Sequence, residues 1–261
     1  MPLGPNELEV ALQRLIDGNA SEADRALVRA ALDVGVIVTG ERAVAIGGNA
    51  SDVIINTGDL GETRRAIQLC EQALPILREI GHSRGEGAVL GNLGLAYAEL
   101  GETRRAIQFY EQTLLIDREI DDRRGEGIDL GNLGIAYAGL NETRRAIEFF
   151  DQTLLIHREI GDRRGEGIGL GNLGNAYKEL GGIRRAVEFF EQQLAIVREI
   201  GDRRGEGNAL WNMSLALDQF GERAQAIQHA EQARTIFEQI EDPNAAKVRA
   251  QLGAWREQTN T

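Results

Sequence analysis

The chain has 261 residues, enough for one or two domains with a hydrophobic core. Its formal net charge of −12 argues against a nucleic-acid partner, because nucleic-acid-binding proteins carry a basic face. The single cysteine, Cys70, excludes an internal disulfide and a cysteine-cluster metal site. We see neither a signal peptide nor an apolar run of about 18 residues, so we expect a cytoplasmic protein that does not enter a membrane.

The N-terminal segment, residues 1–57, does not repeat. "PNELEVALQRLIDG" and "SEADRALVRAALDVG" predict two short helices, the second capped by Ser21 with Asp24 in a capping-box-like pattern. Residues 36–38, 43–46 and 53–55 are short β-type runs separated by glycine-containing turns. Such strands need further packing. They either cover the open end of the following region or pair with another chain.

A period of 40 residues dominates the rest of the chain. "GETRRAIQFYEQTLLIDREI" begins at Gly101, and close or worn copies begin at Gly61, Asn141, Gly181 and Gly221. Each unit holds two helical patterns, such as Leu90-Leu93-Tyr97 and Ala66-Cys70-Ala73-Leu77. Gly101 and Gly161 suit left-handed helix stops, and Asp162 and Asp202 suit helix N-caps. Stacked helix hairpins follow, because one hairpin alone cannot bury its apolar faces. The tail, residues 244–258, predicts a closing amphipathic helix with Trp255 docked inward.

These units resemble the tetratricopeptide repeat (TPR), in which Leu-Gly-x-x-Tyr is followed by Leu-Gly, Ala, an aromatic residue and Leu. One unit shows this pattern at Leu173, Gly174, Tyr177, Leu180, Gly181, Ala186, Phe190 and Leu194. The length and the "REIGDRRGEG" linker are similar to the long-repeat subclass of Pins/LGN-type adaptors and kinesin light chains. The N-terminal segment is similar to bacterial effector-associated modules.

The resemblance implies an all-α fold, a right-handed TPR superhelical solenoid of helix hairpins, preceded by a small mixed α/β segment. We expect an N-terminal segment at 1–57, a solenoid of four to five repeats at 58–242, and a capping helix and tail at 243–261.

The repeated "GNLG" raises a question, because glycine destabilises a helix interior by roughly 1 kcal/mol. The resemblance implies that the second glycine (Gly94, Gly134, Gly174) is a small slot where the two helices of one hairpin touch. The first glycine (Gly91, Gly131, Gly171) is then expected to face the inner groove.

In similar proteins the asparagine between these glycines binds the main chain of a peptide. The alternative is that it satisfies local backbone groups or the neighbouring repeat. Helical spacing then predicts a peptide-binding groove. Its expected residues are Asn92, Asn132, Asn172 and Asn212, with Ile128, Ile168, Leu95, Ile135 and Asn175 beside them and Arg124, Arg164 and Arg204 along one edge.

An apolar stripe of this kind marks a binding surface. We therefore predict an adaptor for a partner peptide or helix with apolar anchors and some acidic character, in bacterial signalling or conflict systems. One alternative is that the stripe packs against another part of the chain. Another is a self-assembling scaffold that forms homo-oligomers through the N-terminal strands and the repeats.

No catalytic constellation is found, so we expect neither an enzyme nor a cofactor or metal. "GLGNLG" at residues 169–174 matches a dinucleotide fingerprint formally, but no strand precedes it. His82, His157 and His229 are isolated. His157 aligns with Asp117 and Val197, which predicts a surface position. The paired arginines that open the second helices, such as Arg144-Arg145, are expected to be solvated and to pair with carboxylates along the helix.

Overall fold

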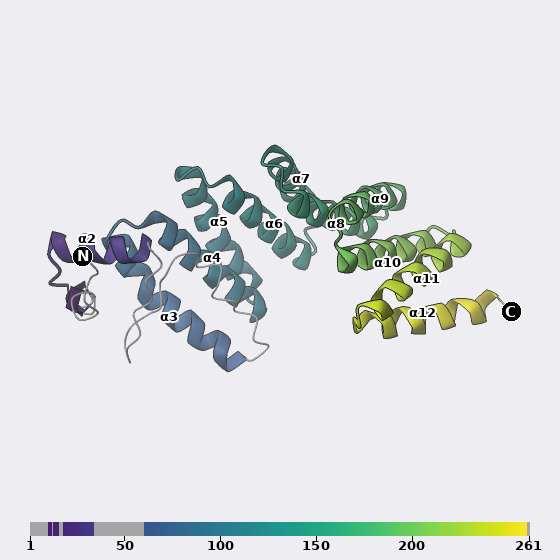
Figure 1. The fold of residues 1–261 in the computed structure, drawn as a ribbon, viewed down its shortest axis with the longest axis horizontal. Helices are drawn as coiled ribbons and strands as arrows, with labels where there is room; N and C mark the ends of the chain where they lie inside the picture. Colours follow the sequence, from purple (N-terminus) through teal and green to yellow (C-terminus); the bar gives the residue numbers. More distant parts are fainter. Residues whose placement is uncertain (1–9, 12, 16–17, 34–59, 260–261) are drawn as a thin grey trace. The chain divides into compact units, whose positions relative to one another are not determined.

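The computed structural model describes residues 10–11, 13–15, 18–33 and 60–259, and these are helices joined by short turns (Figure 1). The helices are α2 (Glu22–Asp33), α3 (Leu60–Glu79), α4 (Ser83–Glu99), α5 (Thr103–Glu119), α6 (Arg123–Gly139), α7 (Thr143–Glu159), α8 (Arg163–Glu179), α9 (Ile183–Glu199), α10 (Arg203–Gln219), α11 (Arg223–Gln239) and α12 (Asn244–Thr259). The predicted strands at 36–38, 43–46 and 53–55 lie outside the described residues, as does the expected domain boundary at 57/58. None of the described helices is long and apolar enough to cross a membrane.

The chain forms two compact units, Met1–Asp129 and Leu130–Thr261, and α6 passes from the first into the second. In the first unit α3 packs on α4 and α4 on α5. In the second, each helix from α7 to α12 packs on the next. In each repeat we call the helix with the "GNLG" register (α4, α6, α8, α10) the first helix, and the one after it the second helix.

The described part of the N-terminal segment agrees with the two predicted helices. Residues 10–11 and 13–15 are helical, and α2 follows. The Ser21 amide donates to Asp24 Oδ2 at 2.8 Å, and the Asp24 amide donates to Ser21 Oγ at 3.2 Å. This reciprocal pair is the predicted capping box. Arg25 of α2 forms an ion pair with Glu79 of α3 at 2.8 Å.

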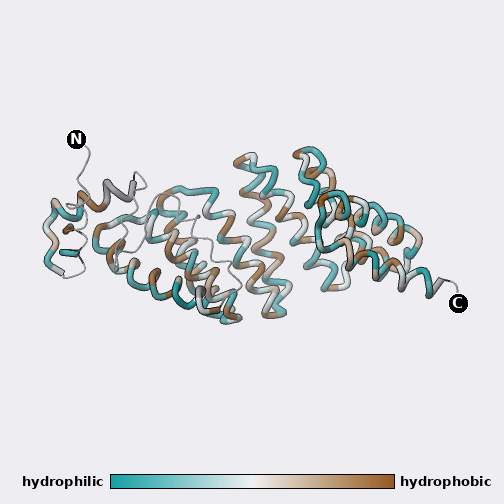
Figure 2. Tube along the Cα trace, turned by 60° about the horizontal axis from the view of Figure 1, so that its bottom comes forward, coloured by the Kyte–Doolittle hydropathy of each residue, from teal (hydrophilic) through white to brown (hydrophobic). Residues whose placement is uncertain are grey.

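The apolar spacing of the repeats produces amphipathic helices, on which hydrophobic and hydrophilic residues alternate along the trace (Figure 2). Leu90, Leu93 and Tyr97 of α4 are buried, as are their counterparts Leu170 and Leu173 of α8. Three- and four-residue spacing places such side chains on one helix face. Burial of that face against neighbouring helices stabilises each hairpin through removal of apolar surface from water.

The turns between helices have the predicted geometry. Gly101 (φ 75°) and Gly161 (φ 69°) adopt the left-handed conformation that ends a helix. The Asp162 and Asp202 carboxylates cap the following helices by accepting from the amides of Gly165 at 2.9 Å and Gly205 at 2.8 Å. These interactions satisfy N–H groups that the helix leaves unpaired. The hairpin design is therefore encoded locally.

The "RRGEG" linker fastens each repeat to the next. In the second unit, Arg158 of α7 donates to Glu166 of α8 at 2.8 Å, and Arg163 also pairs with this carboxylate. Arg198 and Glu206 repeat the contact between α9 and α10 at 2.8 Å. Both glutamates are buried. A buried carboxylate requires such partners, which accounts for the recurrence of this motif.

The glycines of "GNLG" both face the second helix of their own hairpin. A Cβ at Gly174 would lie 2.7 Å from Cδ1 of Phe190, which agrees with the predicted small slot. At Gly131 the nearest atom is Thr153 Cγ2 at 3.7 Å, an ordinary packing distance. The expectation that the first glycine faces an inner groove is therefore wrong. A methyl group at this position would make ordinary contact with the second helix.

In the last repeat a tryptophan takes the place of the first glycine of "GNLG", and α12 closes the unit. Trp211 stands at the register of Gly131, and its ring lies 6.3 Å from that of Trp255 of α12. Trp255 is 1% exposed, and its indole N–H donates to Asp218 Oδ2 at 2.9 Å. Val248 and Leu252 of α12 are buried beside it. α12 therefore covers the apolar face that a further repeat would otherwise contact.

Candidate functional site

The predicted binding residues of α8 form a continuous row on the first helix. Arg164, Ile168, Asn172 and Asn175 follow at spacings of four, four and three residues, which places them on one face. Ile168 is 56% exposed, Arg164 is exposed, and both asparagines are half-buried. Lys178 Nζ donates to Asn175 Oδ1 at 3.4 Å, and burial lowers the pKa of Lys178. α8 therefore presents an apolar side chain beside amide groups.

The neighbouring first helix, α10, contacts α8 and continues the row less openly. Asn212 is half-buried. Arg204 forms an ion pair within the unit, because its Nε lies 3.0 Å from Oδ2 of Asp242. Asp242 is buried and precedes α12. In the part of α6 that belongs to the second unit, Ile135 is 56% exposed and Asn132 is half-buried.

The predicted residues of the first unit differ in exposure. Leu95, Ile128 and Arg124 are exposed. Asn92 is only 6% exposed, and it interacts within the chain. A side chain so buried has little surface to offer to a peptide. For Asn92 this agrees with the alternative reading, in which the asparagine satisfies groups of its own chain.

The face of the second unit formed by Ile135, Ile168, Asn172, Asn175 and Asn212 is hereafter called the first-helix face. Its chemistry suits a polypeptide segment. An amide side chain both donates to a carbonyl and accepts from an N–H group, as a peptide main chain requires. Exposed isoleucines offer apolar surface for anchoring side chains. Among the described residues, no group of acidic, histidine or cysteine side chains is arranged to hold a metal ion.

The second arginine of three pairs (Arg105, Arg145 and Arg185) has a packing role that sequence reasoning missed. The Arg145 guanidinium lies 4.0 Å from the centre of the Tyr137 ring, which stacks on Phe149 at 5.3 Å. Arg145 also forms an ion pair with Glu142 at 3.6 Å. This glutamate precedes the arginine in the sequence, whereas the expected partners lie further along the helix. A cation over an aromatic face is attracted by the ring's quadrupole. These arginines therefore hold the hairpin together.

Two of the three histidines are built into the hairpins. His82 caps α4, since its Nδ1 accepts from the Gly85 amide at 2.9 Å. His157 is 5% exposed, with Nδ1 lying 3.2 Å from Asp162 Oδ2. The prediction of a surface position for His157 is therefore wrong. Variable residue size at this register, which suggested exposure, reflects a buried slot that each repeat fills differently.

The same slot of the first unit holds an acid, which sequence reasoning also missed. Asp117 of α5 is buried, and so is Asp129 of α6, which is 4% exposed. Burial, together with their mutual repulsion and the nearby Asp122, raises the pKa of Asp129 to about 8. Burial and Asp122 also raise the pKa of Asp117 to about 6, while a hydrogen bond with Asp129 and the charge of Arg84 oppose the shift. Counterparts of Asp129 in other repeats are Val89, Gly169 and Ala209, so the signal was an acid at an apolar register.

A second set of exposed apolar residues lies on the second helices. Leu115 of α5 is 66% exposed and Leu155 of α7 is 58% exposed. They occupy one register of the repeat, in the middle of the run "TLLI". The residues on either side of each leucine point inward, so helical periodicity places the leucine on the outer side of its helix.

The family of the chain follows from its sequence. A model of the tetratricopeptide repeat matches residues 58–119, 126–199 and 166–239. Together these ranges cover more than half of the chain, which therefore belongs to the tetratricopeptide repeat family. No curated protein matches the chain in sequence at a significant level.

Solved structures with the same fold include kinesin-light-chain-like proteins, as the resemblance predicted. BtubC (BKLC) from P. vanneervenii is 18% identical with a TM-score of 0.69, covering 90% of this chain and 91% of that one. The nearly identical TPR-like repeats of a kinesin-light-chain candidate from Podosopora anserina are 21% identical with a TM-score of 0.62, covering 74% and 94%. A Rap protein complexed with competence and sporulation factor is 15% identical with a TM-score of 0.55, covering 76% and 60%.

Proposed function

We propose that this protein is an interaction adaptor that holds a peptide or helix of a partner protein on the first-helix face. The observation that carries the proposal is the open row on α8, in which Ile168 is exposed between Arg164 and Asn172. An exposed isoleucine repeated at one helical register is costly to leave in water, and a partner side chain covers it.

The polar groups of the same row define the partner. Asn172 and Asn175 supply donors and acceptors for a main chain, and Arg164 supplies a positive edge. No ion pair with Arg164 is found among the described residues. An extended or helical segment with apolar anchors and some acidic residues meets these requirements. A partner in bacterial signalling or conflict systems belongs to the same proposal.

The family supports this proposal. TPR solenoids serve as protein–protein interaction adaptors, and one fold relative, a Rap protein, was solved in complex with competence and sporulation factor. A homo-oligomer is the second candidate, favoured by the exposed leucines at 115 and 155. Sedimentation of the full chain tests it, because a monomer over the working concentration range excludes self-association.

The adaptor is tested in two steps: partners are captured with the full chain carrying a photo-crosslinking residue at position 168, and binding of a captured protein is then measured to chains that lack the crosslinker. We expect a protein crosslinked there to be lost from Ile168→Asp and to bind Asn172→Ala more weakly by about 1–3 kcal/mol, the range for a lost hydrogen bond. Gln192→Ala, an exposed change on the second helix α9, is the matched control.

Equal binding by Ile168→Asp and by the control would overturn the proposal. The melting temperature of Asn172→Ala should stay close to that of the parent, since this half-buried side chain supports little packing. A large loss of stability with intact binding would assign the asparagine to the fold instead.

A further inference from the structure

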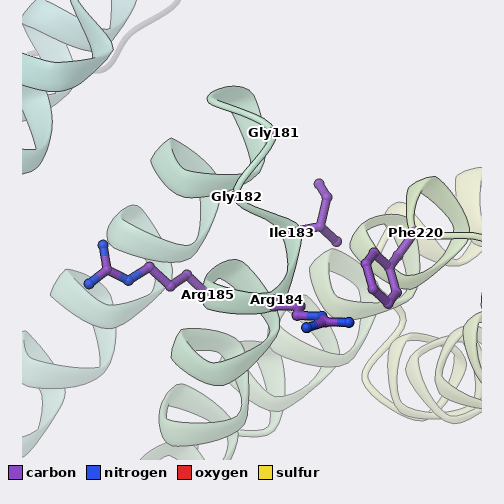
Figure 3. A pocket seen from close by; sticks show the side chains of 6 residues that line it. All are labelled: Gly181, Gly182, Ile183, Arg184, Arg185 and Phe220. Carbon is purple, nitrogen blue, oxygen red and sulfur yellow. The ribbon is translucent and has the colours of Figure 1, made fainter.

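A pocket of about 330 Å³ lies at the turn between α8 and α9, where it meets the end of α10 (Figure 3). Its lining consists of Gly181, Gly182, Ile183, Arg184, Arg185 and Phe220. None of these belongs to the first-helix face. Ile183 is buried, whereas Phe220 is 46% exposed. The pocket therefore has an apolar wall that is open to water.

Arg184 supplies the charge of this pocket. Its guanidinium lies 5.4 Å from the centre of the Phe220 ring, and Figure 3 shows the side chain directed toward that ring. Arg185 points away, and its guanidinium donates to the Tyr177 hydroxyl at 3.2 Å. No ion pair with Arg184 is found within the part of the chain that the structure describes. A guanidinium packed against a ring keeps N–H donors for a carboxylate.

The preceding turn of the same unit shows what is special here. Between α6 and α7 the corresponding residues are Glu142, Thr143 and Arg144, and Leu180 takes the place of Phe220. Glu142 is exposed and pairs with Arg145. At the α8–α9 turn, Gly182 stands in place of the glutamate and Ile183 in place of the threonine. This turn therefore lacks the carboxylate. The pocket has thus lost an acid and gained apolar surface.

The charge of the surroundings defines the ligand. The positive end of the α9 dipole adds to the field of Arg184. The formal net charge of the chain is −12, so the rest of the protein surface does not attract an anionic segment. A carboxylate is therefore favoured at this place in particular, and an apolar side chain next to it in sequence can cover Phe220.

We infer that the α8–α9 pocket binds an acidic side chain of a partner polypeptide together with an adjacent apolar side chain. The carboxylate accepts from the Arg184 guanidinium, and the apolar group packs on Phe220 and Ile183. This site is separate from the first-helix face, and it does not depend on the function proposed for that face.

The test uses two acetylated, amidated tripeptides, Ala-Leu-Asp and Ala-Leu-Asn, which have nearly the same shape and differ in charge. Each is titrated into the ¹⁵N-labelled full chain, and the amide signals of Gly181 and Gly182 are followed. We expect the Asp peptide to shift these signals with saturation, and the Asn peptide to bind about tenfold more weakly, as for one lost charge-assisted hydrogen bond.

Variants make the assignment specific. Arg184→Gln and Gly182→Glu, the latter restoring the acid of the other repeats, should each weaken the Asp peptide about tenfold. Arg144→Gln at the preceding turn is the matched control and should bind as the parent does. Ile168→Asp on the first-helix face should also leave the titration unchanged. Equal shifts by the two peptides, no shift at Gly181 and Gly182, or an equal loss with Arg144→Gln would overturn the inference.

Discussion

Gly174 and Phe190 face each other across the α8–α9 hairpin, and a Cβ on the glycine would lie 2.7 Å from Cδ1 of the ring. In the next hairpin the same two registers hold Ser214 and Ala230, both fully buried. A larger residue on the first helix thus coincides with a smaller one on the second. The two registers share one volume, as close packing of interiors requires.

A double-mutant cycle tests whether the side chains at positions 174 and 190 compete for the same volume. Gly174→Ser should destabilise the fold by roughly 1–3 kcal/mol through overpacking, and Phe190→Ala by roughly 3–5 kcal/mol through the cavity it leaves. The double variant should be more stable than the sum of the two losses predicts, by about 0.5–3 kcal/mol. Urea unfolding followed by circular dichroism measures all four proteins. Strict additivity would show that the two residues do not compete for space.

Trp255 secures the closing helix by two separable interactions. Trp255→Ala should lower the free energy of unfolding by roughly 3–5 kcal/mol, because a buried indole is lost. Trp255→Phe keeps most of the ring and removes the hydrogen bond to Asp218, so the loss should be nearer 1 kcal/mol. Thermal unfolding of the two variants gives the comparison. Equal losses would mean that the hydrogen bond, not burial, holds α12.

The Asp117–Asp129 pair makes stability depend on pH. Burial raises the pKa of Asp129 to about 8, so the folded state binds protons that the unfolded state has already released. Stability from this pair is therefore full below the unfolded pKa of about 4 and is lost as pH rises toward 8. The urea midpoint should increase when the pH is lowered from 8 to 6.

Asp129→Asn should raise stability at pH 8 by roughly 1–3 kcal/mol and flatten this slope. Asp121→Asn, an exposed acid in the same unit, is the control and should keep the slope of the parent. If Asp129→Asn unfolds as steeply with pH as the control does, the pair does not cause the dependence.

Among the residues that the structure describes, three helix ends use a residue other than glycine in the left-handed conformation. Asp121 has φ 58°, Asn141 φ 61° and Glu241 φ 54°. Asp121→Gly should stabilise the chain by up to about 1 kcal/mol, because a side chain is strained at positive φ. Asn141→Gly should gain less, since asparagine tolerates this conformation. Thermal melts rank the two, and a destabilised Asp121→Gly would show that the aspartate side chain outweighs the strain.

Much of the fold could be read from the sequence because it is encoded locally. The period of 40 residues located each hairpin, Gly101 and Gly161 marked its turns, and Asp162 and Asp202 marked the helix starts. Each of these signals acts within a few residues of the chain. The small slot at Gly174 could also be predicted, because the family motif specifies it. The strands expected before residue 58 lie outside the described residues and remain a prediction.

The candidate site was predictable only in part. Helical spacing placed Arg164, Ile168 and Asn172 on one face, and the structure exposes Ile168 as expected. Spacing could not show that Asn92 is buried or that Asp242 pairs with Arg204. Those facts depend on what neighbouring segments cover. The pocket at Phe220 joins residues of two hairpins, and no single repeat reveals it.

The sequence by itself determined the class of the protein, the position of its helices and the register that faces outward, because periodicity and turn chemistry act between near neighbours along the chain. Only the tertiary structure decided whether the register that holds Asp117, His157 and Val197 is buried or exposed. Its variability indicated a surface, yet packing of successive helices buries all three. Burial depends on the atoms brought from other helices, and only the folded chain brings them together.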